Sequence, residues 1–296
     1  MNILSLQNIT KRYQEFIAVN NISLNIPKGS IYGMLGPNGA GKTSTLRMIT
    51  QITLPDSGQI LFEEEPLSQK HLNRIGYMPE ERGLYPKMKV YEQLLYFVKL
   101  RGYSKSQAQQ LLSIWIDKLN IKEWLNKKSN ELSKGQQQKL QFIATVAHQP
   151  SLLILDEPFS GLDPVNANLI KDEISELHKK GTTIIFSTHR MEQVEEICDN
   201  ICLIHQGKVV LDGTLKGIKQ KFRKPLYQIR LENEDNTLFN LERVEVIERL
   251  PNHILIKCID FNQDRQVLEY LTAHLPITYF APFETPLSNI FIEVVS

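Results

Sequence analysis

The residues from Gly36 to Thr43 read Gly-Pro-Asn-Gly-Ala-Gly-Lys-Thr, which is the spacing G-x-x-x-x-G-K-[ST] of a loop that cradles phosphates. Glycines let the backbone turn tightly and direct several N–H groups at one anion. Lys42 supplies a positive charge to the β- and γ-phosphates of a nucleoside triphosphate, and the Thr43 hydroxyl is a ligand for Mg²⁺. The candidate nucleotide-binding residues of this loop are Gly36, Pro37, Asn38, Gly39, Ala40, Gly41, Lys42, Thr43 and Ser44.

Two neighbouring acids, Asp156 and Glu157, follow the apolar run 152–155. At the carboxyl end of a parallel strand, they are expected on the same edge of the sheet as the phosphate loop. We therefore predict that Asp156 binds Mg²⁺, directly or through water, and that Glu157 is the general base that polarises the attacking water. The structural alternative, a helix-capping turn, is disfavoured beside Lys42.

Short apolar runs rich in β-branched residues alternate with longer helical patterns, which predicts an α/β fold of the P-loop NTPase type with a mainly parallel sheet. Residues 31–35, 152–155 and 183–186 are continuous apolar runs, typical of strands buried on both faces. Residues 167–179 carry apolar side chains at helical spacing. Residues 43–50 are predicted to form the helix whose N-terminal end faces the bound anion.

Smaller units are predicted around this sheet. Alternating strands indicate an antiparallel β subdomain at residues 3–6, 22–26 and 59–62. Residues from about 90 to 145 are almost entirely helical and predict an inserted helical subdomain. A boundary is predicted after residue 221, so that residues 1–221 form a nucleotide-binding domain and 222–296 a small α+β domain. The elements expected in that second domain are strands at 226–231, 253–258 and 277–280 and a helix at 264–274.

Three shorter motifs, in order along the chain, resemble those of the ATP-binding cassette (ABC) ATPases that power membrane transporters. Residues 132–136, Leu-Ser-Lys-Gly-Gln, resemble the signature motif of that family, usually LSGGQ. Residues 160–163, Ser-Gly-Leu-Asp, resemble its D-loop, and His189 resembles its switch histidine. With the phosphate loop and the paired acids, the resemblance covers roughly residues 1 to 220.

The resemblance implies a site shared by two subunits. In the family, the signature segment reaches the γ-phosphate of the nucleotide bound to the other subunit, so that ATP holds two subunits together. Ser133, Gly135 and Gln136 are then expected to bind the partner's ATP, and Asp163 is expected at the same interface.

His189 and Tyr13 complete the site that the resemblance implies. His189 is expected to contact the γ-phosphate and to respond to its loss. Tyr13 lies where an aromatic residue of the family stacks on adenine, and ordinary strand packing is its structural alternative.

Glu80 and Lys134 depart from the family's pattern. Glu80 stands where a glutamine usually contacts Mg²⁺ and water. A carboxylate still binds Mg²⁺ through oxygen, but it adds a third negative charge near Asp156 and Glu157, which favours protonation of one carboxyl. We predict that Glu80 alters the pH or metal dependence of hydrolysis without abolishing it. Lys134 replaces a glycine, and its side chain is either solvated or adds positive charge toward the partner's ATP.

Residues 81–88 follow Glu80 and correspond to the groove that receives the membrane subunit in transporters of the family. Exposed side chains at Leu84, Tyr85 and Met88 would suit such a groove. The alternative is an ordinary loop anchored by its apolar residues.

The composition, 42% hydrophobic and 23% charged, is that of an ordinary soluble globular protein. Because 34 Lys and Arg nearly cancel 33 Asp and Glu, no nucleic-acid partner is expected. No apolar stretch is long enough to span a membrane, and the N-terminus lacks a secretion signal. We therefore expect a peripheral protein on the cytoplasmic face of the membrane, with a separate transmembrane permease subunit and a second ABC subunit, identical to this chain or not.

The combined prediction is a subunit that binds and hydrolyses ATP, with Mg²⁺, to power transport. The Glu-Glu-Arg sequence at 80–82 and the C-terminal domain resemble those of bacterial export-type cassettes for sodium and drugs, which indicates export. One alternative is a soluble ABC ATPase that acts on ribosomes or DNA, although a second cassette, a long coiled coil and zinc-binding insertions are not visible. A GTP-binding switch protein is another, but the nearest match to its Asn-Lys-x-Asp motif, residues 126–129, lacks the acid.

Overall fold

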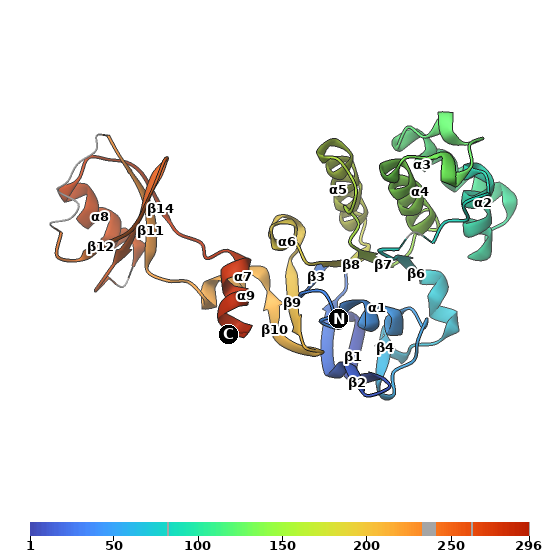
Figure 1. The fold of residues 1–296 in the computed structure, drawn as a ribbon, viewed down its shortest axis with the longest axis horizontal. Coiled ribbons are helices and arrows are strands. Elements are labelled where there is room, and N and C mark those ends of the chain that lie inside the picture. The colour runs from blue at the N-terminus through green and yellow to red at the C-terminus, as the bar shows by residue number, and fades with distance from the viewer. Residues whose placement is uncertain (82, 233–240, 262, 296) are drawn as a thin grey trace. The chain divides into compact units, whose positions relative to one another are not determined.

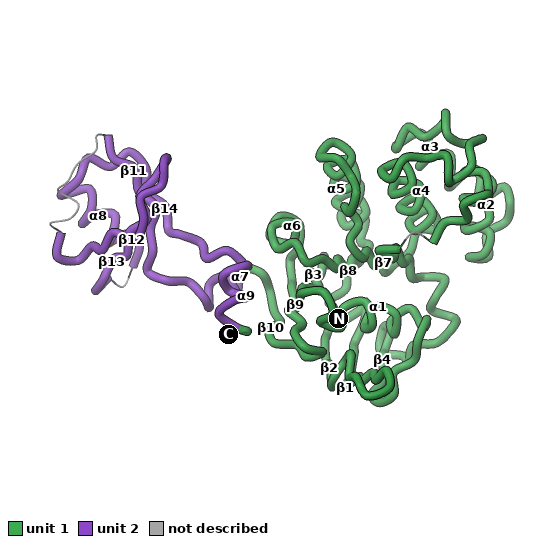
Figure 2. Tube along the Cα trace, viewed as in Figure 1, with its two compact units in different colours: residues 1–215, 295 green, residues 216–294, 296 purple. Residues whose placement is uncertain are grey.

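The computed structural model describes residues 1–81, 83–232, 241–261 and 263–295. Contacts between Cα atoms divide the chain into two units (Figure 2), the first formed by residues 1–215 with Val295 and the second by residues 216–294. The predicted boundary after residue 221 assigns α7 (Leu215–Lys221) to the first domain, whereas the contacts group residues 216–221 with the second unit.

A six-stranded sheet forms the centre of the first unit (Figure 1), in the order β10-β9-β3-β8-β7-β6. Neighbouring strands from β9 to β6 run parallel, and β10 is antiparallel to β9. Every residue of β3, β7 and β8 is buried, as their continuous apolar runs predict. The strands are β3 (Ile31–Leu35), β6 (Ile75–Met78), β7 (Leu152–Asp156), β8 (Thr183–Thr188), β9 (Asn200–His205) and β10 (Lys208–Thr214). The predicted mainly parallel sheet is therefore confirmed.

A second, four-stranded antiparallel sheet has the order β2-β1-β4-β5. Its strands are β1 (Asn2–Tyr13), β2 (Phe16–Pro27), β4 (Ser57–Phe62) and β5 (Glu65–Pro66). One hydrophobic core joins this sheet to the parallel sheet and to α1 (Lys42–Ile49), through side chains such as Leu4, Leu46 and Ile154. The antiparallel subdomain thus holds the helix that follows the phosphate loop.

Helices make up the rest of the first unit. In Figure 1, α2 (Val90–Leu100), α3 (Lys105–Lys118) and α4 (Lys134–Val146) lie together as the predicted helical subdomain. The helix expected at 167–179 begins earlier, as α5 (Pro164–Lys179), because Asp163 caps it and Pro164 occupies its first turn. The helix α6 (Met191–Ile197) follows β8.

The second unit contains a four-stranded antiparallel sheet, in the order β12-β13-β11-β14. Its core includes Tyr227, Ile256 and Leu271, which join the sheet to α8. The strands and helix expected from the sequence are β11 (Leu226–Leu231), β13 (His253–Cys258), β14 (Ile277–Pro282) and α8 (Asp264–His274). The edge strand β12 (Val244–Leu250) and the helix α9 (Leu287–Val295) were not predicted.

Candidate functional site

Four neighbouring parallel strands, β3, β8, β7 and β6, end at one edge of the central sheet. The phosphate loop follows β3, His189 follows β8, Asp156 and Glu157 end β7, and Glu80 comes shortly after β6. Ligands bind at this edge in open parallel sheets. The topology therefore brings together the predicted residues of four separate sequence segments.

The phosphate loop needs glycine at two positions. Gly36 and Gly41 have φ values of 152° and 108°. A Cβ atom would lie 2.2 Å from the Ile204 carbonyl oxygen at Gly36 and 2.3 Å from that of Ala18 at Gly41. Any larger residue would push the loop away from the strands that position it.

Lys42 is buried at the start of α1, and its Nζ donates hydrogen bonds to the carbonyl oxygens of Gly36 at 2.6 Å and Pro37 at 3.1 Å. Burial lowers the pKa of the Lys42 ammonium, while the nearby Glu157, Asp156 and Glu80 carboxylates act in the opposite direction. Lys42 lines the same cavity as these three acids, and a polyphosphate bound there would pair with its ammonium.

Asp156 is buried and held by two hydroxyl groups. The Thr43 Oγ1 donates to Oδ2 at 3.1 Å, and the Ser187 Oγ donates to Oδ1 at 2.8 Å. Burial raises the pKa of the Asp156 carboxyl, the two hydroxyl groups lower it, and the Glu157 and Glu80 charges raise it further. A cation at this carboxylate would favour its ionised form.

Glu157 is held by the two residues at and after the end of β8. Its Oε2 accepts from the Thr188 hydroxyl at 3.0 Å, and its Oε1 accepts from the His189 backbone N–H at 2.9 Å. The His189 Nδ1 also lies 2.6 Å from Oε1. Glu157 has a φ of 51°, a left-handed conformation that is unusual for glutamate and is found at functional sites. The carboxylate is thus fixed in orientation at the strand end.

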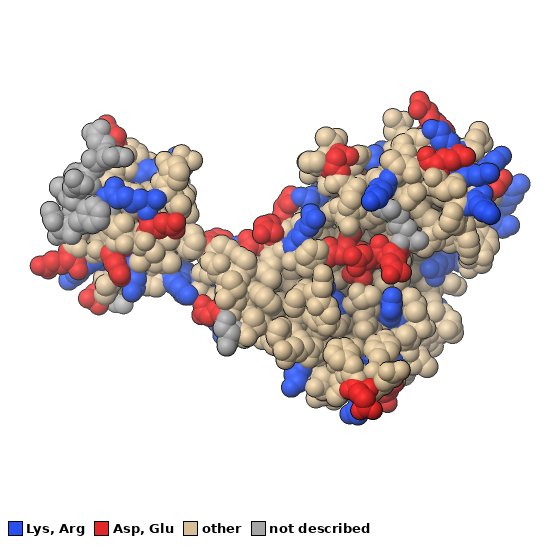
Figure 3. Space-filling model, in the orientation of Figure 1, with Lys and Arg blue, Asp and Glu red and all other residues tan. Residues whose placement is uncertain are grey.

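Lys42, Asp156 and Glu157 line one cavity of about 360 Å³, whereas the predicted residues Gly36, Pro37 and His189 are not among its lining residues. Figure 3 shows acidic side chains gathered on this face over the ends of β6, β7 and β8. The aromatic rings of Tyr13 and Phe16, 41% and 62% exposed, are at the end of the β1–β2 hairpin and line the same cavity. The lining residues are Tyr13, Phe16, Ala18, Asn38, Gly39, Ala40, Gly41, Lys42, Thr43, Ser44, Glu80, Asp156 and Glu157.

Ser133, Gly135, Gln136 and Asp163 do not line this cavity. Ser133 caps α4, since its Oγ accepts from the Gln136 N–H at 3.3 Å and the Gln136 side chain accepts from the Ser133 N–H at 2.9 Å. Asp163 caps α5 by accepting from the Asn166 N–H at 3.0 Å. The Ser133, Lys134 and Asp163 side chains are exposed.

Sequence patterns assigned no role to Phe16, Ala18, Ser187 or Thr188. Phe16 belongs to the hairpin that contains Tyr13, and Ser187 and Thr188 precede the predicted His189. The Ser187 hydroxyl contacts Asp156 and the Thr188 hydroxyl contacts Glu157. These contacts follow from the pairing of β7 with β8, which sets Asp156 opposite Ser187.

The oxygen atoms at this edge fit Mg²⁺, which prefers hard oxygen ligands. The Thr43 hydroxyl and the Asp156 carboxylate are already 3.1 Å apart, and Glu80 lines the same cavity. Among the described residues, no group of three or more His, Cys, Asp or Glu side chains could hold a metal ion by itself. Magnesium bound through one or two carboxylates is usually completed by substrate phosphates and water.

The loop after Glu80 is partly as expected. Tyr85 is 49% exposed and stacks on Phe97, but Leu84 and Met88 are half-buried rather than exposed. The buried Gln93 explains this packing, because its side chain accepts from the Tyr85 N–H and donates to the Ser129 hydroxyl. Arg82 lies outside the described residues. Next to this loop is a cavity of about 480 Å³, lined by Tyr77, Pro79, Gly83, Leu84, Phe97, Leu100, Arg101, Gln141, Ala144 and Thr145.

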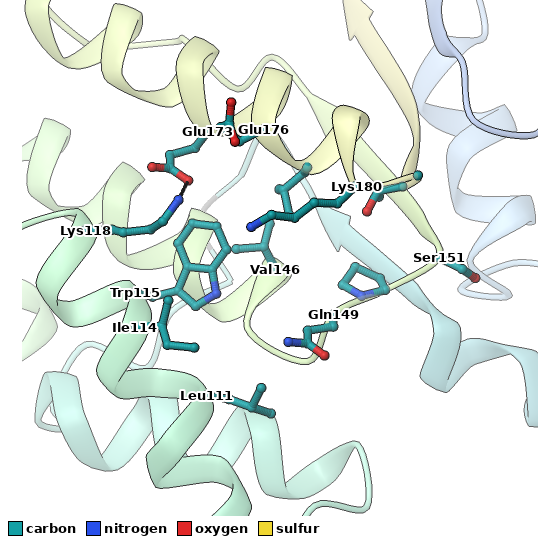
Figure 4. Close-up of a pocket in the computed structure, with 14 residues that line it drawn as sticks. Leu111, Ile114, Trp115, Lys118, Val146, Gln149, Ser151, Glu173, Glu176 and Lys180 are labelled. Carbon is teal, nitrogen blue, oxygen red and sulfur yellow. Dashed lines mark hydrogen bonds and ion pairs between the residues drawn. The ribbon is translucent and has the colours of Figure 1, made fainter.

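A different cavity of about 460 Å³ lies between α3, α5 and the segment after α4 (Figure 4). It contains none of the predicted site residues. Trp115 lines it, and the Lys118 ammonium pairs with the Glu173 carboxylate at 2.6 Å. This ion pair joins the helical subdomain to α5.

Residues 19–160 match the family model described as ABC transporter, and residues 213–295 match the model of the C-terminal domain of DrrA1-3-like ATP-binding proteins. The chain is 42% identical over 293 residues to the uncharacterized ABC transporter ATP-binding protein YhaQ of Bacillus subtilis (strain 168), covering 99% of this chain and 98% of that protein.

Two further comparisons agree with these matches. The chain is 37% identical over 227 residues to the bacitracin transport ATP-binding protein BcrA of Enterococcus faecalis, covering 75% of this chain and 72% of that protein. A solved structure of an ATP-binding subunit of an ABC transporter superposes with a TM-score of 0.70 at 27% identity, covering 74% of this chain and 93% of that chain. No described helix is both long and apolar enough to cross a membrane.

Proposed function

The chain belongs to the family of ATP-binding subunits of ABC transporters, and from this premise we propose that Lys42, Asp156, Glu157 and His189 are the central residues of its ATPase site. The protein is an ABC ATPase of a transporter rather than a GTP-binding switch or a ribosome- or DNA-directed ATPase. The observation that carries the site assignment is the carboxylate of Glu157, fixed by β8 beside the phosphate-loop cavity.

Hydrolysis requires a water molecule to attack the γ-phosphorus while the bond to the β-phosphate oxygen breaks. Glu157 accepts the proton of that water. A carboxylate has about four acceptor positions, and Thr188 and His189 occupy three in the hydrogen bonds described above. One position therefore remains for water. His189, with a half-exposed imidazole against the same carboxylate, contacts the γ-phosphate.

The phosphates lie on the loop and at the N-terminal end of α1, where unpaired N–H groups and the Lys42 ammonium neutralise them. Thr43, Asp156 and Glu80 hold Mg²⁺. When bound, the ion neutralises charge on the β- and γ-phosphate oxygens. Tyr13, with Phe16 beside it, stacks on the adenine.

The active form is a dimer of ABC subunits. Ser133, Gly135 and Gln136 bind the γ-phosphate held by the partner subunit, and Asp163 packs at that interface. Two observations support this arrangement: these residues lie outside their own cavity, and the capped N-terminal end of α4 is exposed. The first-turn N–H groups that the cap leaves unpaired attract anions.

The subunit works on the cytoplasmic face of the membrane, bound to a separate transmembrane subunit. The cavity that Leu84, Phe97 and Leu100 line receives a segment of that partner. The exposed Tyr85 side chain contacts the same segment. The match to a DrrA-like C-terminal domain and the similarity to a bacitracin transport protein favour export. The domain 222–296 is an accessory domain of the same subunit.

Replacement of Glu157 by Gln tests the ATPase site, because it keeps the shape of the side chain and removes its capacity as a base. We expect ATP hydrolysis to fall by about 10²–10⁴-fold, the usual contribution of a general base. ATP binding should persist, and light scattering should detect an ATP-bound dimer. Glu64→Gln is a matched control, since Glu64 also has a left-handed φ, 69°, but lies outside the cavity. Equal rates for the two variants would exclude Glu157 as the base.

Replacement of Tyr85 by Asp tests the membrane partner. The variant should keep the ATPase rate of the isolated chain but lose co-purification with the transmembrane subunit and transport. Normal assembly and transport would overturn the docking assignment, and recovery with ribosomes or DNA instead of membranes would overturn the partner class.

A further inference from the structure

Two glutamines on one face of α4 reach out of the helix to the loops that carry acids. Gln138 and Gln141 are 3% and 4% exposed. The Gln138 Nε2 donates to the Pro158 carbonyl oxygen at 2.9 Å, and the Gln141 Nε2 donates to that of Pro79 at 2.7 Å. Pro158 directly follows Glu157, and Pro79 directly precedes Glu80.

We propose that Gln138 and Gln141 are positioning residues of the ATPase reaction, which transmit the position of α4 to Glu157 and Glu80. The inference rests on the proposed function, because it takes Glu157 as the base and the N-terminal end of α4 as the contact with the partner's ATP. The two glutamines then link a subunit's contact with its partner's nucleotide to the acids in its own cavity.

The geometry of α4 makes this link direct. The helix runs from Lys134 to Val146, and Ser133 and Gln136 close its first turn by reciprocal hydrogen bonds. Gln138 therefore lies one to two turns from the exposed end, a distance of roughly 8 Å at 1.5 Å per residue. Since no loop intervenes, a shift of the capped end moves both amide groups.

Gln141 is not explained by stability alone. Its Oε1 is buried and has no hydrogen-bond partner among the described residues, so the side chain keeps an unpaired acceptor while its amide holds Pro79. A buried unpaired polar atom destabilises the fold. An apolar side chain of similar volume would avoid that cost, which indicates that the contact with Pro79 serves another purpose.

Methionine substitutions test the proposal, because methionine has a similar length and no amide. In the full chain, Gln138→Met should lower kcat about tenfold, the effect of losing one hydrogen bond worth ~1.4 kcal/mol, with KM for ATP changed less than about twofold. Gln141→Met should weaken the Mg²⁺-dependent binding of ADP. The Mg²⁺ concentration at which ADP binding, measured by calorimetry, is half of its maximum should rise about threefold. The thermal midpoint of this variant should change little, because removal of the unpaired Oε1 offsets the loss of the hydrogen bond to Pro79.

Gln137→Met is the matched control. Gln137 also lies on α4 and also donates to backbone carbonyls, those of Ser129 and Leu132, but these lie within the helical subdomain. This variant should keep both kcat and the Mg²⁺ dependence. In a Glu80→Gln background, Gln141→Met should have no additional effect on Mg²⁺ dependence, because the group it positions is already altered.

The inference is wrong if Gln138→Met and Gln141→Met match Gln137→Met in kcat and Mg²⁺ dependence. It is also wrong if the Gln141→Met and Glu80→Gln effects add, since a general loosening of the fold acts independently of Glu80. A wild-type rate in Glu157→Gln would instead refute the proposed base, so the two failures are distinguishable.

Discussion

Thr188 at the end of β8 offers a direct test of how the sheet orients the candidate base. It is fully buried, donates to Glu157 Oε2 at 3.0 Å, and accepts from the Arg190 N–H at 3.1 Å. Thr188→Val keeps the shape of the side chain and removes both interactions. The perturbation therefore acts on the orientation of the carboxylate and leaves its charge in place.

The expected loss follows from the two hydrogen bonds. A bond to a charged group contributes about 1.5–3 kcal/mol, and an unpaired buried N–H costs about 1 kcal/mol. Since Glu157 is only 8% exposed, water replaces the lost donor poorly. We expect the free energy of unfolding to fall by about 2–4 kcal/mol. We expect kcat to fall by at least about tenfold, because general-base catalysis depends on geometry.

Thr183→Val, at the opposite end of the same strand, is the control. Thr183 is also fully buried, and its Oγ1 accepts from the Gly29 N–H at 2.8 Å. Loss of this neutral bond should cost about 1 kcal/mol and leave kcat unchanged. Urea unfolding gives the stability of each variant, and initial rates of phosphate release at saturating Mg²⁺ and ATP give kcat.

Retention of the wild-type kcat in folded Thr188→Val would refute the idea that β8 orients the base. An equal loss of kcat in both variants would also refute it, because stability alone would then explain the effect.

The other predictions concern charge. Glu80→Gln should move the acid limb of the pH–rate profile to lower pH, because Glu80 helps to raise the pKa of Asp156, and an unchanged profile would contradict this. The hydrogen bond from Arg74 is the main cause that lowers the pKa of Glu63 from 4.5 to about 2. The Glu63 carboxylate therefore stabilises the fold above pH 4.5 and loses that effect as the pH falls toward 2. Glu63→Gln should thus lower the free energy of unfolding by about 1 kcal/mol at pH 7 and hardly at pH 2.5 in urea titrations, whereas a constant difference would exclude the linkage. Lys118→Met should destabilise the chain by about 1–2 kcal/mol by leaving the 12% exposed Glu173 carboxylate unpaired (Figure 4), and adding Glu173→Gln should restore most of that loss.

The fold could be predicted where hydrophobic periodicity was strong. Continuous apolar runs identified β3, β7 and β8, because strands covered on both faces are apolar along their middle, with polar residues only at the ends of β7 and β8. The edge strand β12 is mostly exposed and carries charged residues, so its alternation is weak. The helix α9 has nine residues, of which six are apolar, and periodicity alone does not separate such a short segment from a strand.

The candidate site divides in a similar way. Lys42 and Glu157 belong to motifs whose spacing is visible in the sequence. Thr188 acts through the register of β8 against β7, and Gln141 acts through the packing of α4 against the end of β6. These contacts join residues that are 31 and 62 positions apart, so no local pattern encodes them.

The arrangement of the helix ends explains why a second subunit is required by the proposed function. Lys42 and the acids converge on one cavity, but Ser133 and Asp163 begin two other helices outside it. The Ser133 side chain caps α4 and the Asp163 side chain caps α5, and each accepts from one backbone N–H group of its helix. The other N–H groups of the first turn have no partner within the helix. Those groups suit a polyphosphate, yet their own chain's phosphate loop does not supply one there. Under the proposed function, a nucleotide held by another copy or a related subunit would pair with such groups, and the proposed role of the two buried glutamines of α4 is to link that contact to hydrolysis.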